Sequence, residues 1–325
     1  MNGLLRKLCR LPTAARPALG AAVLVVWGLF ASACDRGGPA SSTEGGFPHD
    51  LGSTSLPENP ERIVVLEFSF IDALASVGVA PVGIADDKRA EERILPVYGE
   101  LIGDGWKSVG TRKAPRLETI AALQPDLIIA DTTRHADLYE LLSRIAPTLV
   151  FNSLEGDYHD SLKQMAAIGE AIGRSEDMAA RLAEHRVKMA AYSERIRPYA
   201  EGVVAQFGVA SAESLSLHSP ASYAGSLLTL LGFSSNLAPG DDPYVEADRE
   251  MLSAIDPDLL IVGEYSDPSI VDSWAGSELF DGLTAVEAGA VHNVNANNWS
   301  RLRGMVAAEL AAEALLGILE ADGGF

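Results

Sequence analysis

The stretch PRLETIAALQPDLIIA at residues 115–130 returns as ADREMLSAIDPDLLIV at residues 247–262. In both copies a step of seven residues leads from a glutamate, Glu118 or Glu250, to the proline of a Pro-Asp pair. The pattern predicts a short helix led by an acidic residue, followed by an apolar run with the length and flanks of a buried parallel strand. Two similar α/β lobes are therefore expected, and the cleft between them is the place to look for function.

The rest of the chain alternates in the same way. Apolar segments at residues 62–66, 81–85 and 148–151 predict strands with helices between them, which favours a mainly parallel sheet. Residues 175–197 contain neither Gly nor Pro, and their apolar side chains recur at helical spacing up to Pro198. The predicted fold class is α/β, with two Rossmann-like lobes of mainly parallel sheets joined by one long rigid helix.

The N-terminal segment predicts export. Four positive charges precede a charge-free stretch at residues 18–33, whose last small residues lead directly to Cys34. This layout resembles a bacterial lipobox, which implies a diacylglycerol on Cys34 and cleavage before it. An uncleaved single-span anchor is the alternative, but 16 residues fall short of the ~20 that a membrane helix needs.

Residues 34–57 are rich in Gly, Ser and Pro, which predicts a flexible tether. The predicted organisation is a lipoprotein signal peptide at 1–33, the tether at 34–57, an N-terminal α/β lobe at 58–172, an inter-lobe helix at 173–198 and a C-terminal α/β lobe at 199–325.

Charge and cysteine content exclude several classes of function. The formal net charge is −20, and removal of the signal's four positive charges changes it to −24. Such a balance argues against nucleic acid and against electrostatic docking on anionic lipid. Cys9 would leave with the signal and Cys34 would carry lipid, so the exported part has no thiol for a disulfide. The six histidines show no metal-binding spacing, and no metal site is predicted.

Three further motifs are WKSVGTR at residues 106–112, DTTRH at 131–135 and WSRLRG at 299–304. Together with the duplicated segments they resemble the ferric-citrate and ferric-siderophore substrate-binding proteins of bacterial ABC importers, over the whole chain after Pro57. The resemblance implies a monomer without a cofactor, not an enzyme, that delivers an iron chelate to a permease of two membrane subunits with a cytoplasmic ATPase. It also implies a lipid anchor in the cell membrane, with the protein facing the periplasm or the cell exterior.

A ferric chelate presents oxygen atoms and negative charge around an iron that is already saturated. Its receptor therefore needs cations and hydrogen-bond donors, and arginine suits this because its planar fork pairs with carboxylates. The predicted ligand-binding cations are Arg112, Arg134, Arg301 and Arg303, with His135 as a hydrogen-bond donor. Trp106, Tyr223 and Trp299 are predicted to cover the apolar parts of the chelate.

Glu118 and Glu250 begin the two repeated helices, where a negative charge gains from the helix dipole. The resemblance implies a second use, because glutamates at the matching positions of the family meet arginines on the two permease subunits. A pair related by pseudo-symmetry suits a dimeric partner.

Other functions stay open at this point. Cobalamin or haem could replace the ferric chelate within the same class, and chelatases and nitrogenase-like enzymes share this lobe type. The chain could also be a sensory or structural lipoprotein. Against an enzyme stand the missing phosphate loop, nucleophile elbow and cysteine cluster. The pair Asp86-Asp87 is predicted to be a turn, and His185 on the long helix is predicted to face solvent.

Overall fold

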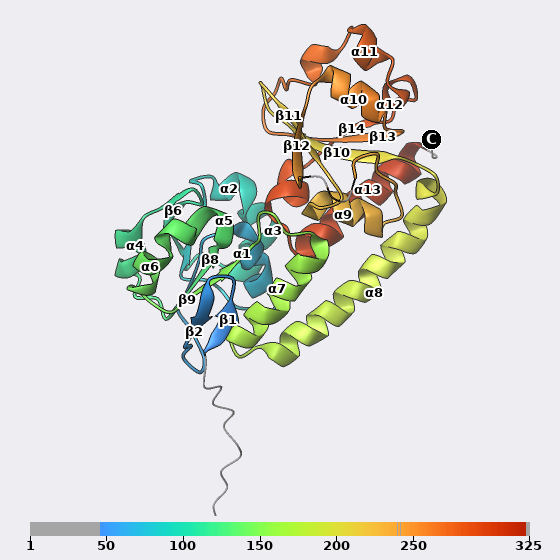
Figure 1. Cartoon of the computed structure of the whole chain (residues 1–325). Helices are drawn as coiled ribbons and strands as arrows, with labels where there is room; N and C mark the ends of the chain where they lie inside the picture. The colour runs from blue at the N-terminus through green and yellow to red at the C-terminus, as the bar shows by residue number, and fades with distance from the viewer. Residues whose placement is uncertain (1–45, 239, 241, 323–325) are drawn as a thin grey trace, which may run out of the picture. The chain divides into compact units, whose positions relative to one another are not determined.

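The computed structural model describes residues 46–238, 240 and 242–322 (Figure 1). The predicted signal peptide, Cys34 and the first part of the predicted tether lie outside these residues. Among the helices described, none combines the length and the apolar character needed to cross a membrane.

The first lobe is built on a parallel sheet with strand order β5-β4-β3-β8-β9. The strands are β3 (Ile63–Val65), β4 (Gly83–Ile84), β5 (Lys107–Ser108), β8 (Leu127–Asp131) and β9 (Thr148–Phe151). Helices cover both faces of this sheet, so strands such as β3 and β8 are buried at every residue. The helices are α1 (Phe68–Ala75), α2 (Ala90–Arg93), α3 (Leu95–Ile102), α4 (Leu117–Ala122), α5 (Thr132–His135), α6 (Tyr139–Ser143) and α7 (Tyr158–Ala171), with a 3₁₀ turn at Ala136–Leu138.

The second lobe carries a mixed sheet with strand order β12-β11-β10-β13-β14. Its strands are β10 (Ala205–Ala210), β11 (Leu215–His218), β12 (Tyr244–Ala247), β13 (Leu259–Glu264) and β14 (Val291–Val294). β10, β13 and β14 are parallel, whereas β11 and β12 pair antiparallel at one edge. The helices are α9 (Tyr223–Leu230), α10 (Arg249–Ile255), α11 (Glu278–Asp281), α12 (Thr284–Glu287) and α13 (Met305–Asp322), with a 3₁₀ turn at Asp272–Trp274 and a π-helical turn at Asn297–Arg301.

The duplicated segments form equivalent structures in the two lobes, as predicted. Each gives a short helix, α4 or α10, and then a buried strand, β8 or β13, inside a parallel pairing. The side chain of the aspartate in each Pro-Asp pair accepts hydrogen bonds from backbone N–H groups just before the neighbouring strand. Asp126 accepts from the N–H groups of Glu61 and Arg62, at 2.9 Å each. Asp258 accepts from the N–H of Val204 at 2.8 Å. Both copies of the repeat therefore share the same helix–strand connection and the same aspartate–backbone hydrogen bonding.

The predicted inter-lobe helix is α8 (Ser175–Ala200), which lies alongside α7 and α13 (Figure 1). It does not end before Pro198, because that proline lies in its last turn, where the missing N–H removes a single helical hydrogen bond. The prediction that His185 faces solvent is also wrong. His185 is fully buried, and its ring nitrogens lie 2.6 Å from the Tyr158 hydroxyl and 2.8 Å from a Glu309 carboxylate oxygen.

Successive residues of the central strands point to opposite faces, and the inner faces share one core. Ile63 of β3 and Ile261 of β13 belong to a single buried cluster that also takes in apolar side chains of α1, α7, α8, α9 and α13. Val64 and Val262 belong to two separate clusters on the outer faces. A continuous core that passes from lobe to lobe opposes large hinge motion, because opening would expose apolar surface.

The second half of the predicted tether is not a tether. Residues 47–54 form a hairpin of β1 (Phe47–His49) and β2 (Gly52–Thr54) that packs on the first lobe beside β9. The N–H of Asp50 donates to the carbonyl of Val150 at 3.0 Å, and the Thr54 hydroxyl donates to that of Thr148 at 3.0 Å. The Gly- and Ser-rich composition concealed this hairpin, whose attachment comes from hydrogen bonds and from the packing of Phe47.

Candidate ligand-binding site

A cavity of about 310 Å³ opens between the two lobes, and all four predicted cations line it. The first lobe contributes Arg112, Lys113, Arg134 and Leu154 to its wall. The second lobe contributes Val209, Ser216, His218, Tyr244, Tyr265, Ser300, Arg301 and Arg303. The volume lies at the lower end of the range of small-molecule sites, about 300–1,000 Å³.

The two first-lobe arginines stand on short turns at the sheet edge. Arg112 lies between β6 (Gly110–Thr111) and β7 (Ala114–Pro115), and Arg134 lies on α5 directly after β8. Arg112 forms an ion pair with Asp87 in which Nε and Nη2 both donate to Oδ2, at 3.0 and 2.8 Å, and its guanidinium lies 4.1 Å from the centre of the Phe68 ring. Burial would lower the pKa of Arg112, but the charges of Glu67 and Asp87 raise it overall.

Glu67 organises the cluster, and no sequence motif pointed to it. Glu67 is 1% exposed and lies between β3 and α1, as the N-cap residue of α1. One carboxylate oxygen lies 2.5 Å from Nε of Arg134, and the other lies 3.3 Å from Nη1 of Arg112 and 3.0 Å from Nη2 of Arg303. Since Arg303 belongs to the second lobe, this carboxylate joins the two halves of the site.

The second-lobe arginines flank the end of the π-helical turn. Arg303 has a left-handed backbone (φ 45°), is nearly buried, and donates from Nη1 to the carbonyl of Ser300 at 3.1 Å. Arg301 stacks on Tyr265, with its guanidinium 3.4 Å from the ring centre, and donates to Oδ1 of Asn297 at 2.8 Å. Within the described part of the chain, Arg301 has no ion pair with a carboxylate. Burial and the neighbouring cations Arg93 and Arg112 lower its pKa to about 10, so it stays charged and has spare positive charge for an anion.

Polar and aromatic groups complete the wall. Burial first, and then the charge of Arg303, lower the pKa of His218 to about 3, so its ring is neutral. Its Nδ1 has no hydrogen-bond partner among the described residues. The Tyr244 hydroxyl crosses to the first lobe and donates to the carbonyl of Leu154 at 2.5 Å. The sequence did not single out His218, Tyr244 or Tyr265, because nothing in their spacing distinguishes them from ordinary strand and loop residues.

Four predicted ligand contacts lie elsewhere. His135 is fully buried and does not line this cavity. Its Nδ1 accepts from the Asp131 N–H at 2.9 Å and its Nε2 lies 2.7 Å from the Arg112 carbonyl, so it supports the arginine turn. Trp299 is 1% exposed and stacks on Phe207 in the core. Trp106 lines a separate surface pocket beside α3.

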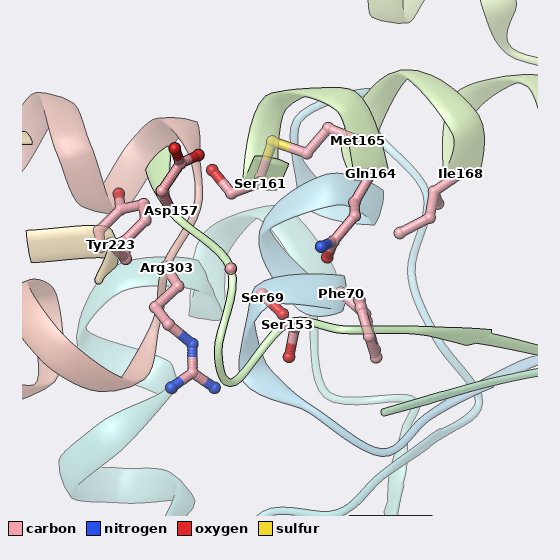
Figure 2. A pocket seen from close by; sticks show the side chains of 11 residues that line it. Ser69, Phe70, Ser153, Asp157, Ser161, Gln164, Met165, Ile168, Tyr223 and Arg303 are labelled. Atoms are coloured by element: carbon pink, nitrogen blue, oxygen red, sulfur yellow. The ribbon is translucent and has the colours of Figure 1, made fainter. Parts of the chain in front are cut away.

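Tyr223 lies beside a second, much smaller cavity, which Figure 2 shows next to Arg303. This cavity measures about 10 Å³, enough for about one water molecule. The Tyr223 hydroxyl donates to the carbonyl of Gly304 at 2.6 Å, which anchors α9 to the start of α13. Tyr223 therefore supports the backbone next to Arg303, outside the main cavity.

The two repeat glutamates are remote from these contacts. Glu118 and Glu250 are exposed in the first turns of α4 and α10 and line neither cavity described above. Asp87, predicted to be part of a simple turn, belongs to the site through its bonds to Arg112 and Arg93. Burial would raise the pKa of Asp87, but its interactions with these two arginines lower it overall.

The match to a family model supports this description. The model for periplasmic binding proteins matches residues 63–296. The chain belongs to the periplasmic binding protein family. That family is one of binding proteins, in agreement with the predicted class and against an enzyme. Among the residues described, no group of three or more His, Cys, Asp or Glu side chains is arranged to hold a metal ion.

The chain is similar to two named iron-binding proteins. It is 42% identical to the Fe(3+) dicitrate-binding periplasmic protein FecB of Escherichia coli, over 80% of this chain and 85% of FecB. It is 37% identical to the Fe(3+)-citrate-binding protein YfmC of Bacillus subtilis, over 91% of this chain and 93% of YfmC. The fold matches the crystal structure of Staphylococcus aureus SirA complexed with staphyloferrin B, with a TM-score of 0.75, 24% identity, and coverage of 84% and 97% of the two chains.

Proposed function

We propose that this protein is the substrate-binding lipoprotein of an ABC importer and captures a ferric chelate, ferric citrate or a related siderophore, in the cleft between its lobes. The observation that carries the proposal is the convergence of Arg112, Arg134, Arg301 and Arg303 on one cavity in a chain of strongly negative charge. A cluster of this kind suits an anion rich in oxygen atoms, because each guanidinium offers a planar pair of donors.

The similarity to FecB and YfmC favours citrate as the chelator, since the names of both proteins specify it. Iron arrives as part of the ligand and is held by the chelator, so the protein requires no metal ligands of its own. Cobalamin and haem are the competing ligands of the same class, and the arginine-lined wall favours the chelate over both.

The proposed partners follow from this role. The exposed Glu118 and Glu250 would each meet one subunit of a dimeric permease, which works with a cytoplasmic ATPase. The lipid on Cys34 would hold the monomeric protein at the membrane surface, facing the periplasm or the cell exterior. Replacing Cys34 with serine should release the protein into the soluble fraction, whereas retention with an intact signal peptide would contradict the anchor.

Native mass spectrometry of the protein purified from iron-starved cells tests the proposal. The expected result is a bound mass equal to a ferric chelate, lost when a stronger iron chelator is added. A bound corrinoid or porphyrin, or protein that stays ligand-free when ferric citrate and ferric siderophores are supplied, would contradict it.

A further inference from the structure

Glu67 is a buried acid among the arginines that, under the proposed function, attract an anionic ligand. Its side chain is fully shielded from solvent, yet its two oxygens contact guanidinium groups of Arg112, Arg134 and Arg303. A single carboxylate is thus shared by three arginines from two lobes. An unpaired carboxylate at this depth would be costly, and the arginines provide the compensation.

The charges around the cavity do not cancel. Four guanidiniums, those of Arg112, Arg134, Arg301 and Arg303, line the wall. Among the residues that the structure describes, the carboxylates that contact them are Glu67 and Asp87, and Asp87 also binds Arg93 at 2.8 Å. At least two positive charges therefore remain for the ligand. The neutral ring of His218 adds none, and Lys113 is exposed to solvent.

A fixed internal anion changes what the cluster binds. Charges separated by a few ångströms in a partly buried site interact far more strongly than in water, so one carboxylate more or less alters the affinity for an anion severalfold. Glu67 lies beneath the arginines, out of contact with solvent, so a ligand meets the field of the whole cluster with Glu67 included.

We propose that Glu67 is a specificity-determining residue, a permanent counter-ion that reduces the positive charge of the cleft and so sets the negative charge that a bound chelate carries. This inference rests on the proposed function, since it places an anionic chelate in the cavity. It assigns Glu67 an electrostatic role in addition to its alignment of the arginines.

Glu67→Gln removes the charge and keeps the size of the side chain, and Glu67→Asp keeps the charge while shortening the reach. Asp177→Asn is the matched control, because it removes one negative charge from the exposed pair of Asp177 with Arg174 on α8. The mature protein and these variants are titrated with ferric dicitrate between about 20 and 500 mM NaCl, and thermal melting checks that each is folded.

The expected result is that Glu67→Gln binds ferric dicitrate about fivefold more tightly than the parent at about 20 mM NaCl. The gain should disappear by about 500 mM, so the salt dependence is steeper. Glu67→Asp and Asp177→Asn should keep the parental salt dependence. If Glu67→Gln and Glu67→Asp both weaken binding with the parental salt dependence, Glu67 only positions the arginines and the proposal is wrong.

A second variant covers the case in which Glu67→Gln does not fold. Asp87→Asn removes the other carboxylate of the cluster from a partly exposed position, and it should steepen the salt dependence in the same way. An unchanged salt dependence in that variant would overturn the proposal. If the parent protein binds no anionic ferric chelate at all, the proposed function itself fails, which is a separate and distinguishable outcome.

Discussion

Arg303 reaches across the cleft to Glu67, with its Nη2 3.0 Å from Oε2, although 236 positions separate the two residues in the chain. The bond ties the last turn before α13 to the first turn of α1 and holds a second-lobe cation against two first-lobe cations. A ligand that enters the cavity therefore meets arginines that are already oriented. Such preorganisation reduces the conformational entropy lost on binding.

Alanine at Arg112, Arg134 or Arg303 should each weaken binding of ferric dicitrate about tenfold to 150-fold. Loss of one charge-assisted contact in a closed site costs about 1.5–3 kcal/mol. Lysine at Arg112 should recover only part of the affinity, because it keeps the charge and loses the fork that engages Asp87. Arg174→Ala, at the exposed position just before α8, is the control in a tryptophan-quenching titration. Equal affinities for all variants and the parent would contradict the arginine site.

The joint between α1 and α13 depends on a missing side chain at Gly304. A Cβ there would lie 2.1 Å from Cγ of Asp72, a buried carboxylate that accepts from the Tyr98 hydroxyl and the Ala307 N–H. Gly304→Ala should lower the free energy of unfolding by about 1–3 kcal/mol, measured by urea denaturation.

The control lies within α13, the helix that follows Gly304. A Cβ on Gly317 meets nothing within 4 Å, so Gly317→Ala should raise the free energy of unfolding by up to about 1 kcal/mol. Equal effects at the two glycines would show that contact with Asp72 is not what excludes a side chain at Gly304.

Acid sensitivity should arise partly from Glu309. Burial alone would raise the pKa of this carboxyl, but hydrogen bonds from His185, Arg181 and Lys188 lower it from 4.5 to about 2. Because the folded-state pKa is depressed, the stabilisation is fully present above pH ~4.5 and is lost as the pH falls toward ~2. Glu309→Gln should therefore cost about 2–3 kcal/mol at pH 7 and reduce the decline in stability between those pH values.

Glu313→Gln, at an exposed position on the same helix, serves as the control in urea denaturation at pH 7 and pH 3. A parallel decline in stability with acid in the parent and in Glu309→Gln would show that the bonds to Glu309 do not carry the effect.

Charge reversal at Glu118 and Glu250 should abolish uptake while ligand affinity stays within about threefold. Both side chains are exposed on separate lobes and away from the arginine cavity, so the change would act on the permease contact. Uptake of radioactive iron by cells and titration of the purified double variant measure the two effects. Glu184→Lys on α8 is the exposed control. Loss of ligand affinity in the double variant would contradict a docking role.

Sequence reasoning succeeded where short-range patterns decide the structure. The helix–strand unit of the repeat is local, and an apolar run such as residues 127–130 can only be a buried strand once helices flank it. The four arginines that line the cavity could be named because they follow recognisable motifs. Glu67 could not be, because its role depends on partners up to 236 positions away.

Residue type also did not reveal which side chains face the cavity and which are buried in the interior. Trp299 and His135 stand beside the arginines in sequence, but each turns into the interior and packs or bonds there. In contrast, Tyr244 and Tyr265 reach the cavity from distant strands and loops. The direction of a side chain is set by the helix, strand or loop that carries it, and the placement of that element depends on the three-dimensional fold.

The most direct measurement is a titration of the purified mature protein with ferric dicitrate, followed by tryptophan fluorescence, with iron-free citrate, cobalamin and haem in parallel. The expected result is saturable binding of ferric dicitrate or another anionic ferric chelate with a Kd below about 10 µM, about −7 kcal/mol, and much weaker binding of the parallel ligands. Failure of every ferric chelate to bind below that concentration, or tighter binding of cobalamin or haem, would contradict the assignment of the arginine cleft to an iron chelate.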